Sequence, residues 1–265
     1  MRQVLTLFMI LLISILTASL FAHSFLSNTS VDPPQIHIGV AFCGNTTAEA
    51  KLLIDRVKTY TNLFVLQSGP IVESENATNE ILDYAIENGL DIIVYFGWFN
   101  PDYPWRIQWL DYAEQRWGSR LLGVYLNDEL GGVELDHPWE HYFRMLKERN
   151  STWYLSHAAA IEDYLNGSSQ NRDYDTAAKI YSDYLNDIDT GVGLGRLKTS
   201  SITAFMSDYA LFWFDYKAGY DVLLAQVGWN HTLPQDIALV RGAARMQNKT
   251  WGIIITWKYD EEPIP

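Results

Sequence analysis

Seven apolar runs of strand length alternate with amphipathic segments of helix length, and this alternation limits the fold more than any other feature of the chain. Runs that are apolar throughout are typical of strands buried on both faces. Thr46 and Glu49 have the spacing of a capping box, which predicts a helix start after the first run. The pattern therefore predicts an α/β domain with a helix-covered parallel sheet. The predicted strands are 36–42, 63–66, 91–96, 121–126, 202–206, 222–227 and 251–257.

The number and order of these units favour a (β/α)8 TIM-barrel-like domain. The chain stops at Pro265, soon after the seventh run, so we expect truncation after strand seven. The alternative within a barrel is an extra strand at Trp153–Ser156. A doubly wound open sheet is the second architecture, and its Gly-rich nucleotide loop should follow the first strand. That turn reads Cys43-Gly44-Asn45 and lacks the fingerprint.

The first residues have the character of an export segment. Arg2 precedes a run of uncharged residues, 4–22, whose length is close to that needed to span a bilayer. We expect residues 1–26 to form a signal or membrane-anchor segment, 27–35 a linker and 36–265 the barrel domain. An uncleaved anchor and a cleaved signal peptide both stay open. Either predicts a protein at the cell surface or outside the cell, with residues 4–22 as its contact with the membrane.

Glycosylation motifs support this location. The chain has seven Asn-x-Ser/Thr sites, where its 14 Asn and 32 Ser and Thr residues predict about 1.7 by chance. An excess of this size favours an exported glycoprotein. The sites are Asn28, Asn45, Asn76, Asn150, Asn166, Asn230 and Asn248.

Charge and cysteine content narrow the possible partners and source. The chain has 19 Lys and Arg and 32 Asp and Glu, so its net charge is −13. Because binding to duplex nucleic acid needs clustered positive charge, we expect no nucleic acid partner. Cys43 is the single cysteine, so the chain forms no internal disulfide. An exported protein without disulfides favours a prokaryotic envelope, and the glycosylation motifs add an archaeal cell surface to that expectation.

Carboxylates and aromatic residues follow the predicted strands, where the reactive groups of a barrel lie. Glycoside hydrolysis uses one carboxylic acid as general acid and a second carboxylate as nucleophile or base, while aromatic faces stack on sugar rings. These positions therefore predict a carbohydrate site. The candidate catalytic residues are Glu129, Asp208, Asp128, Asp260 and Glu261; the candidate substrate-binding residues are Trp98, Asn127, Tyr209, Trp229 and Trp257.

The segment 123–129, Gly-Val-Tyr-Leu-Asn-Asp-Glu, resembles the strand-four motif of glycoside hydrolase-like (β/α)8-barrel proteins, in which the final Glu is the general acid. The resemblance implies that role for Glu129. The chitinase-like group has aspartates two and four residues before the Glu, where this chain has Asn127 and Tyr125. The large retaining group has an Asn-Glu pair there and a second Glu after strand seven. Here Asp128 interrupts the pair and Trp257 stands at the second position.

Residues 36–262 are also similar to archaeal exported proteins of unknown activity, which have an Asp-Glu-x-Gly-Gly turn after strand four. The turn here is Asp128-Glu129-Leu130-Gly131-Gly132, and the Trp-rich stretch 251–259 fits the same group. This second resemblance implies a glycosidase-like barrel without indicating a substrate.

If the protein is an enzyme, Glu129 is assigned as the general acid. Asp128 beside it and an apolar setting should raise its pKa towards neutrality. Asp208 is the preferred partner, because strand five lies next to strand four. Asp260 or Glu261 is the alternative if the strand-seven loop folds back over the barrel mouth.

A non-catalytic carbohydrate- or ligand-binding protein stays open as the second function. It needs only the aromatic platform of Trp98, Trp229 and Trp257, without a carboxylate pair. Glu129 itself would then bind ligand or order its loop. In the enzyme, Asn127 would hold a sugar hydroxyl or orient Glu129, and the same two roles are open to Tyr209.

Two further patterns are interpreted as structural, so we predict no metal and no cofactor. Residues 137–141, His-Pro-Trp-Glu-His, match an inverted zinc protease motif, but Pro138 places His137 at or before the helix start and spoils the ligand geometry. Cys43 and His37 are six residues apart, too far for a nucleophile and its base, so we expect a buried thiol.

Overall fold

The computed structural model describes residues 36–132, 144, 148, 174–186, 193–228 and 232–256. Contacts divide the chain into two units, Met1–His37 and Ile38–Pro265, and every element below belongs to the second. The predicted export segment 1–26 and linker 27–35 lie outside the described residues, as do Trp153–Ser156 and the histidine motif 137–141. Among the described helices, none combines the length and apolar character that a membrane crossing requires.

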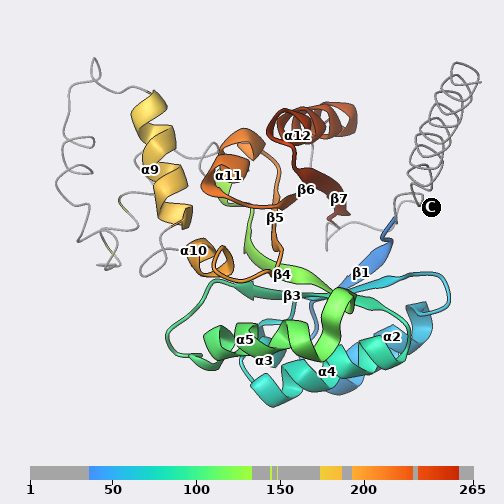
Figure 1. The fold of residues 1–265 in the computed structure, drawn as a ribbon. Coiled ribbons are helices and arrows are strands. Elements are labelled where there is room, and N and C mark those ends of the chain that lie inside the picture. Colours follow the sequence, from blue (N-terminus) through green and yellow to red (C-terminus); the bar gives the residue numbers. More distant parts are fainter. Residues whose placement is uncertain are drawn as a thin grey trace, which may run out of the picture. The chain divides into compact units, whose positions relative to one another are not determined.

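Seven parallel strands form one sheet, which curls into a half barrel (Figure 1). The strands stand in the sheet in their order along the chain, so the predicted α/β class and the parallel sheet are confirmed. A doubly wound sheet is ruled out, because its strand order would reverse in the middle. The strands are β1 (Gly39–Phe42), β2 (Leu63–Leu66), β3 (Asp91–Gly97), β4 (Leu121–Asp128), β5 (Ala204–Asp208), β6 (Val222–Val227) and β7 (Thr250–Ile255).

Helices follow the strands as the alternating pattern predicts. The capping box is present: the Glu49 amide donates to Thr46 Oγ1 at 3.2 Å, and the Thr46 amide donates to the Glu49 carboxylate at 3.2 Å. Its helix, α2, spans Thr47–Val57. The other described helices are α3 (Gly69–Val72), α4 (Glu75–Glu87), α5 (Trp105–Trp117), the 3-10 turn η1 (Gly118–Arg120), α9 (Tyr174–Asn186), α10 (Leu194–Leu197), α11 (Phe212–Ala218) and α12 (Leu233–Gln247).

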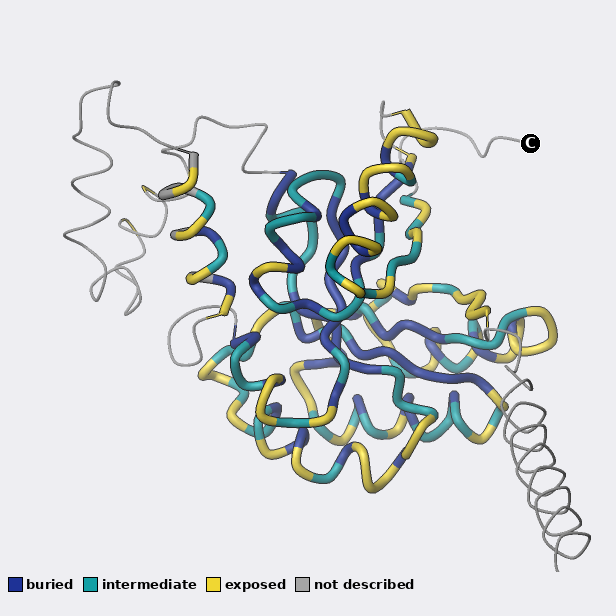
Figure 2. The backbone as a smooth tube through the Cα atoms, turned by 45° about the horizontal axis from the view of Figure 1, so that its top comes forward, coloured by how far each residue is buried: buried dark blue, intermediate teal, exposed yellow. Residues whose placement is uncertain are grey.

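Two apolar clusters lie on the two faces of the sheet. The larger one joins outward strand residues such as Phe64, Val94 and Met206 to the helices. The smaller one, on the inner face of the curl, contains Val65, Ile93, Tyr125 and Phe205. Figure 2 shows the central strands buried and the outer turns of the helices exposed. Successive strand residues therefore point alternately outward, into the larger cluster, and inward, to the hollow side of the curl. We call the end of the hollow side at which the carboxyl ends of the strands lie the mouth of the curl.

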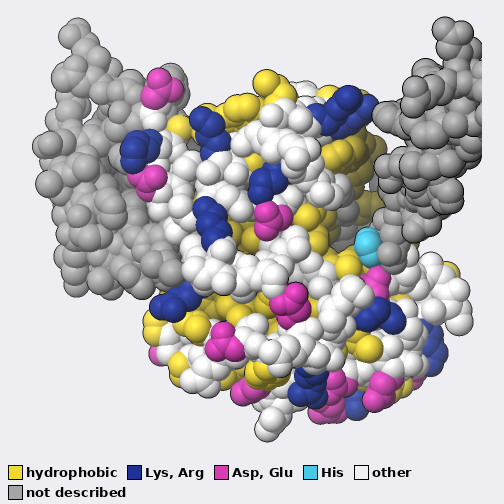
Figure 3. Space-filling view, viewed as in Figure 1, with side chains coloured by type: hydrophobic (Ala, Val, Ile, Leu, Met, Phe, Trp, Pro, Cys, Tyr) yellow, Lys and Arg dark blue, Asp and Glu magenta, His cyan; other side chains and the backbone are white. Residues whose placement is uncertain are grey.

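The described surface mixes charges of both signs. On the face in Figure 3, acidic and basic side chains are interspersed with apolar and polar groups. Three of the asparagines in glycosylation motifs, Asn45, Asn76 and Asn248, belong to the described residues, and all three are exposed.

Candidate functional site

A bulge at the end of β4 sets the direction of its last side chains. Tyr125 pairs with Phe205, and Asp128 pairs with Ser207, so β4 holds one more residue than β5 between these two pairs. An extra residue reverses the alternation of side chains along a strand. Tyr125 and Asp128 therefore lie on the same inner face, where the Tyr125 hydroxyl donates to Asp128 Oδ1 at 2.9 Å.

The backbone on both sides of Asp128 is left-handed, with φ +63° at Asn127 and φ +61° at Glu129. Such a conformation costs about 1–3 kcal/mol at a residue other than glycine, and it persists where surrounding contacts hold it. Asn127 Nδ2 donates to the Tyr220 hydroxyl at 2.7 Å, and the Glu129 amide donates to the Ser207 carbonyl at 3.0 Å. This strained turn presents two neighbouring carboxyl groups at the mouth of the curl.

Asp128 is the centre of a hydrogen-bond network that draws on four strands. Besides Tyr125, its carboxylate accepts from Gln67 at 3.3 Å and from Ser207 and Gln226. Gln226 also donates to Ser207 Oγ at 2.8 Å. Gln67 directly follows β2, while Ser207 and Gln226 lie near the ends of β5 and β6. Gln67, Ser207 and Gln226 are not among the predicted site residues, although a polar residue near the end of an apolar strand is an available signal.

Burial raises the pKa of the Glu129 carboxyl, and the negative charge of Asp128 raises it further. A hydrogen bond from Gln226 acts in the opposite direction. Both predicted causes of a raised Glu129 pKa are therefore present. The same carboxylate affects Tyr95 on β3. Burial is the larger cause and the negative charge of Asp128 the second cause that raise the pKa of Tyr95 to about 12. A carboxyl with a raised pKa holds its proton at higher pH, as a general acid requires.

Asp208 lies on the opposite face of β5 from Ser207, because adjacent strand residues point to opposite sides. It is fully buried and accepts the backbone N–H groups of Gly131 at 2.5 Å and Gly132 at 2.8 Å. It also accepts those of Tyr209 at 2.7 Å and Ala210 at 3.1 Å. The structure thus places Asp208 beneath the turn that carries Glu129, rather than facing Glu129 across the mouth.

This arrangement explains the glycine pair of the Asp-Glu-x-Gly-Gly turn. A Cβ atom on Gly131 would stand 2.6 Å from Asp208 Oδ2, and one on Gly132 would stand 2.1 Å from the Tyr209 ring. Both distances are far below van der Waals contact. The two glycines therefore let the backbone reach the Asp208 carboxylate and the Tyr209 ring.

A second buried acid lies near Asp208. Asp215 on α11 is fully buried and accepts the Tyr181 hydroxyl at 2.7 Å, while its Oδ2 has no hydrogen-bond partner among the described residues. Burial, followed by the Asp208 charge, raises the pKa of Asp215 well above its usual range. Burial raises the pKa of Asp208 to about 7, against the effect of its four backbone hydrogen bonds. Both acids therefore keep their protons to a higher pH in the folded protein than in the unfolded chain.

Asp215→Asn should stabilise the protein increasingly as the pH rises. An unfolded Asp titrates near about pH 3.9, so above this pH the folded parent holds protons that the unfolded chain has released, and stability falls with rising pH. The asparagine cannot ionise and loses this penalty. Urea unfolding of the full chain in detergent at pH 4, 6 and 8 measures the effect. We expect a variant-minus-parent difference in unfolding free energy that grows towards pH 8.

Asp55→Asn is the matched control for this titration. Asp55 is exposed, and hydrogen bonds from Lys58 and Tyr84 lower its pKa. Its contribution to stability is therefore gained above its usual pKa, and the control should lose stability relative to the parent as the pH rises. A flat or falling difference for Asp215→Asn would contradict the buried-acid interpretation.

The predicted binding residues have different surroundings. Trp98, after β3, is 47% exposed, and its carbonyl accepts from Arg106 at 3.1 Å. Asn127 supports the β4 turn through Tyr220, and the half-buried Tyr209 ring packs on Gly132. The remaining predicted site residues lie outside the described residues: Trp229, Trp257, Asp260 and Glu261.

Cys43 corrects one sequence expectation. It follows the short strand β1 and is exposed, so the predicted buried thiol is wrong. The reason is that β1 is an edge strand of the curled sheet, with β2 as its described neighbour. Partial desolvation by neighbouring atoms still raises the pKa of the Cys43 thiol, and the negative charge of Asp128 raises it further, so the thiolate form is disfavoured. Among the described residues, no group of three or more His, Cys, Asp or Glu side chains is arranged to hold a metal ion.

No family model and no curated protein matches the chain.

Proposed function

We propose that the protein is an exported, glycoside hydrolase-like (β/α)8 barrel with Glu129 as general acid. The observation that carries this proposal is the position of the Glu129 carboxyl on a strained turn at the end of the fourth parallel strand, next to the Asp128 carboxylate, and the raised pKa of Glu129 agrees with the role. A glycosidic bond breaks when an acid of this kind protonates the leaving oxygen.

The barrel assignment is supported by the sheet. Seven parallel strands stand in chain order in a sheet that curls into a half barrel, and β1, β2, β3, β5 and β6 are each followed by a described helix. Barrel enzymes place their reactive groups at the carboxyl ends of the strands. The Asp128 network gathers the ends of β2, β4, β5 and β6 at this position.

In the proposed reaction, Glu129 gives its proton to the glycosidic oxygen while the bond to the anomeric carbon breaks. Water adds to that carbon, and its released proton restores Glu129. Asp128 stabilises the positive charge that develops on the sugar, and Gln226 orients Glu129. Asp260 and Glu261 stay alternative partners, while Asp208 is assigned to holding the turn because its carboxylate accepts buried backbone amides.

Carbohydrate binding without hydrolysis is the second candidate, and the exposure of Trp98 favours it. Trp98 is 47% exposed and directly follows β3, the neighbour of β4 in the sheet, so its indole offers a flat apolar face to a sugar ring. Trp229 and Trp257 complete the proposed platform. This function needs no proton transfer from Glu129.

A glycan array followed by a reducing-end assay separates the two functions. The full chain in detergent is applied to the array, and each glycan that binds is then incubated with protein and assayed for new reducing ends. New reducing ends support the enzyme, and binding without them supports the binding protein. A chain that binds no glycan on the array contradicts both.

We further propose that the protein is tethered to an archaeal cell surface by residues 4–22 and glycosylated at several of its seven motifs. The exposure of Asn45, Asn76 and Asn248 supports glycan attachment. Mass spectrometry of native membrane fractions tests this proposal. Unmodified asparagines at all seven motifs, with the protein in the cytoplasmic fraction, would overturn it.

A further inference from the structure

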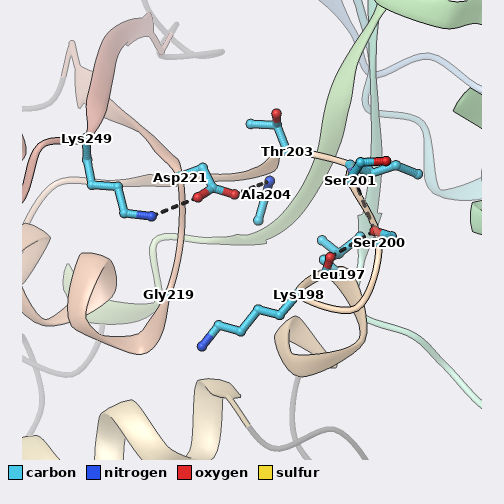
Figure 4. A pocket seen from close by; sticks show the side chains of 10 residues that line it. Leu197, Lys198, Ser200, Ser201, Thr203, Ala204, Gly219, Asp221 and Lys249 are labelled. Carbon is cyan, nitrogen blue, oxygen red and sulfur yellow. Dashed lines mark hydrogen bonds and ion pairs between the residues drawn. The ribbon is translucent and has the colours of Figure 1, made fainter.

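A cavity of about 530 Å³ lies at the amino ends of β5, β6 and β7, the opposite end of the sheet from Glu129 (Figure 4). Its volume falls within the range of about 300–1,000 Å³ that is typical of small-molecule sites. Figure 4 shows Lys249 and Asp221 on one side, Lys198 along another and Ser200 and Ser201 opposite them. The lining is mainly polar, so it suits a ligand rich in hydrogen-bonding groups.

Positive charge in this cavity exceeds negative charge. Lys249 Nζ lies 2.7 Å from Asp221 Oδ1, and Asp221 Oδ2 accepts the Ala204 amide at 3.1 Å, so the Asp221 charge is already engaged. Lys198 Nζ donates to two uncharged acceptors, Asn186 Oδ1 at 2.7 Å and the Ala218 carbonyl at 2.9 Å. An ammonium group has three donors. Among the described residues, Lys198 has no third acceptor, so one N–H beyond these two bonds can donate to an anion.

The two lysines also affect one another. Partial burial lowers the pKa of Lys198, and the positive charge of Lys249 lowers it further, while Asp221 acts in the opposite direction. An anion placed between the lysines would relieve this repulsion.

Hydroxyl groups line the side opposite the lysines. Ser200 Oγ donates to the Leu197 carbonyl at 2.8 Å, and Ser201 Oγ donates to Glu114. Hydroxyl oxygens have two acceptor lone pairs, so these groups can still accept from a ligand hydroxyl.

A second cavity adjoins the first and indicates the orientation of a ligand. The second cavity, of about 440 Å³, shares Ser201 and Thr203 with the first and extends to Glu114 and Leu121. Glu114 would repel an anion, whereas the lysine end would attract one. A ligand that fills both cavities therefore has its charge at one end and an uncharged, hydroxylated body at the other.

We propose that this cavity binds a small polyhydroxylated anion, with its carboxylate or phosphate between Lys198 and Lys249 and its hydroxyls towards Ser200 and Ser201. The proposal is independent of the function assigned to Glu129, because the two sites lie at opposite ends of the strands.

Isothermal titration of the full chain in detergent at low ionic strength tests this site. The probes are glucose 6-phosphate and glucuronate, with glucose lacking the anion and inorganic phosphate lacking the body. We expect at least one of the two hydroxylated anions to bind more tightly than both glucose and inorganic phosphate. Their relative affinities distinguish a phosphate site from a carboxylate site. Lys198→Gln should weaken that binding by about 10-fold or more, the usual effect of losing a charge-assisted hydrogen bond.

Lys217→Gln is the matched control. It removes the same charge from α11, where Lys217 lies over the Trp213 ring outside the cavity, and should leave binding unchanged within about 2-fold. Circular dichroism of both variants checks folding. Failure of both anionic probes to bind, binding of glucose or inorganic phosphate as tight as that of the hydroxylated anions, or equal losses in the two variants would overturn the site.

Discussion

Glu129→Gln should lower glycan hydrolysis by about 10²- to 10⁴-fold while glycan binding persists. Glutamine keeps the shape of the side chain and can still accept the Gln226 hydrogen bond, but it has no proton to give to a leaving oxygen. Initial rates on the glycan identified by the array, together with its binding constant, measure the two effects separately. Glu80→Gln on α4 is the matched control, because Glu80 pairs with Lys51 on the helical surface. It should hydrolyse at the parental rate.

The pH dependence of the hydrolysis rate tests the role of Glu129 independently. A general acid must be protonated at the start of the reaction, so the parental rate should fall as the pH rises through the raised Glu129 pKa. The residual activity of Glu129→Gln should lack this limb. A variant that hydrolyses as fast as the parent, with an unchanged profile, would remove Glu129 as the acid and leave the binding function.

The alternation of apolar runs along the sequence predicted the strands and their order in the sheet. The runs at 63–66 and 222–227 match β2 and β6 residue for residue, because each is bounded by polar residues or glycine. The runs at 121–126 and 202–206 match less well, since β4 and β5 extend two residues further. Those last residues are Asn127 and Asp128 in β4 and Ser207 and Asp208 in β5. A pattern based on apolar residues ends a strand too early where polar residues belong to the strand.

The site itself was only partly predictable, and the bulge in β4 is the reason. Simple alternation places Asp128 and Tyr125 on opposite faces, whereas the extra residue brings them together. The same rule, applied to β5, separates Ser207 from Asp208. Their positions at the ends of predicted strands made Asp128, Glu129 and Asp208 candidate site residues. The direction of each side chain, however, determines that Ser207, rather than Asp208, joins the hydrogen-bond network of Asp128.

Asp208→Ala should produce the largest loss of stability, roughly 3–5 kcal/mol in unfolding free energy, because it leaves two buried and two partly buried backbone N–H groups without their acceptor. The loss should be larger at pH 5 than at pH 8. The folded pKa of about 7 lies above the unfolded value, so the parental carboxyl contributes most at low pH. Urea unfolding measures both effects, and hydrogen exchange at Gly131 and Gly132 should quicken.

Asp208→Asn separates loss of the acceptor from loss of the side chain. Its Oδ1 can still accept from Gly132, Tyr209 and Ala210, but its Nδ2 would face the Gly131 N–H, two donors in one hydrogen-bond position. Its stability should therefore fall between those of the alanine variant and the parent. Asp55→Ala, which removes an exposed carboxylate paired with Lys58, should have little effect. If Asp208→Ala were as stable as this control, Asp208 would not hold the turn, and its assignment as the catalytic partner of Glu129 would return.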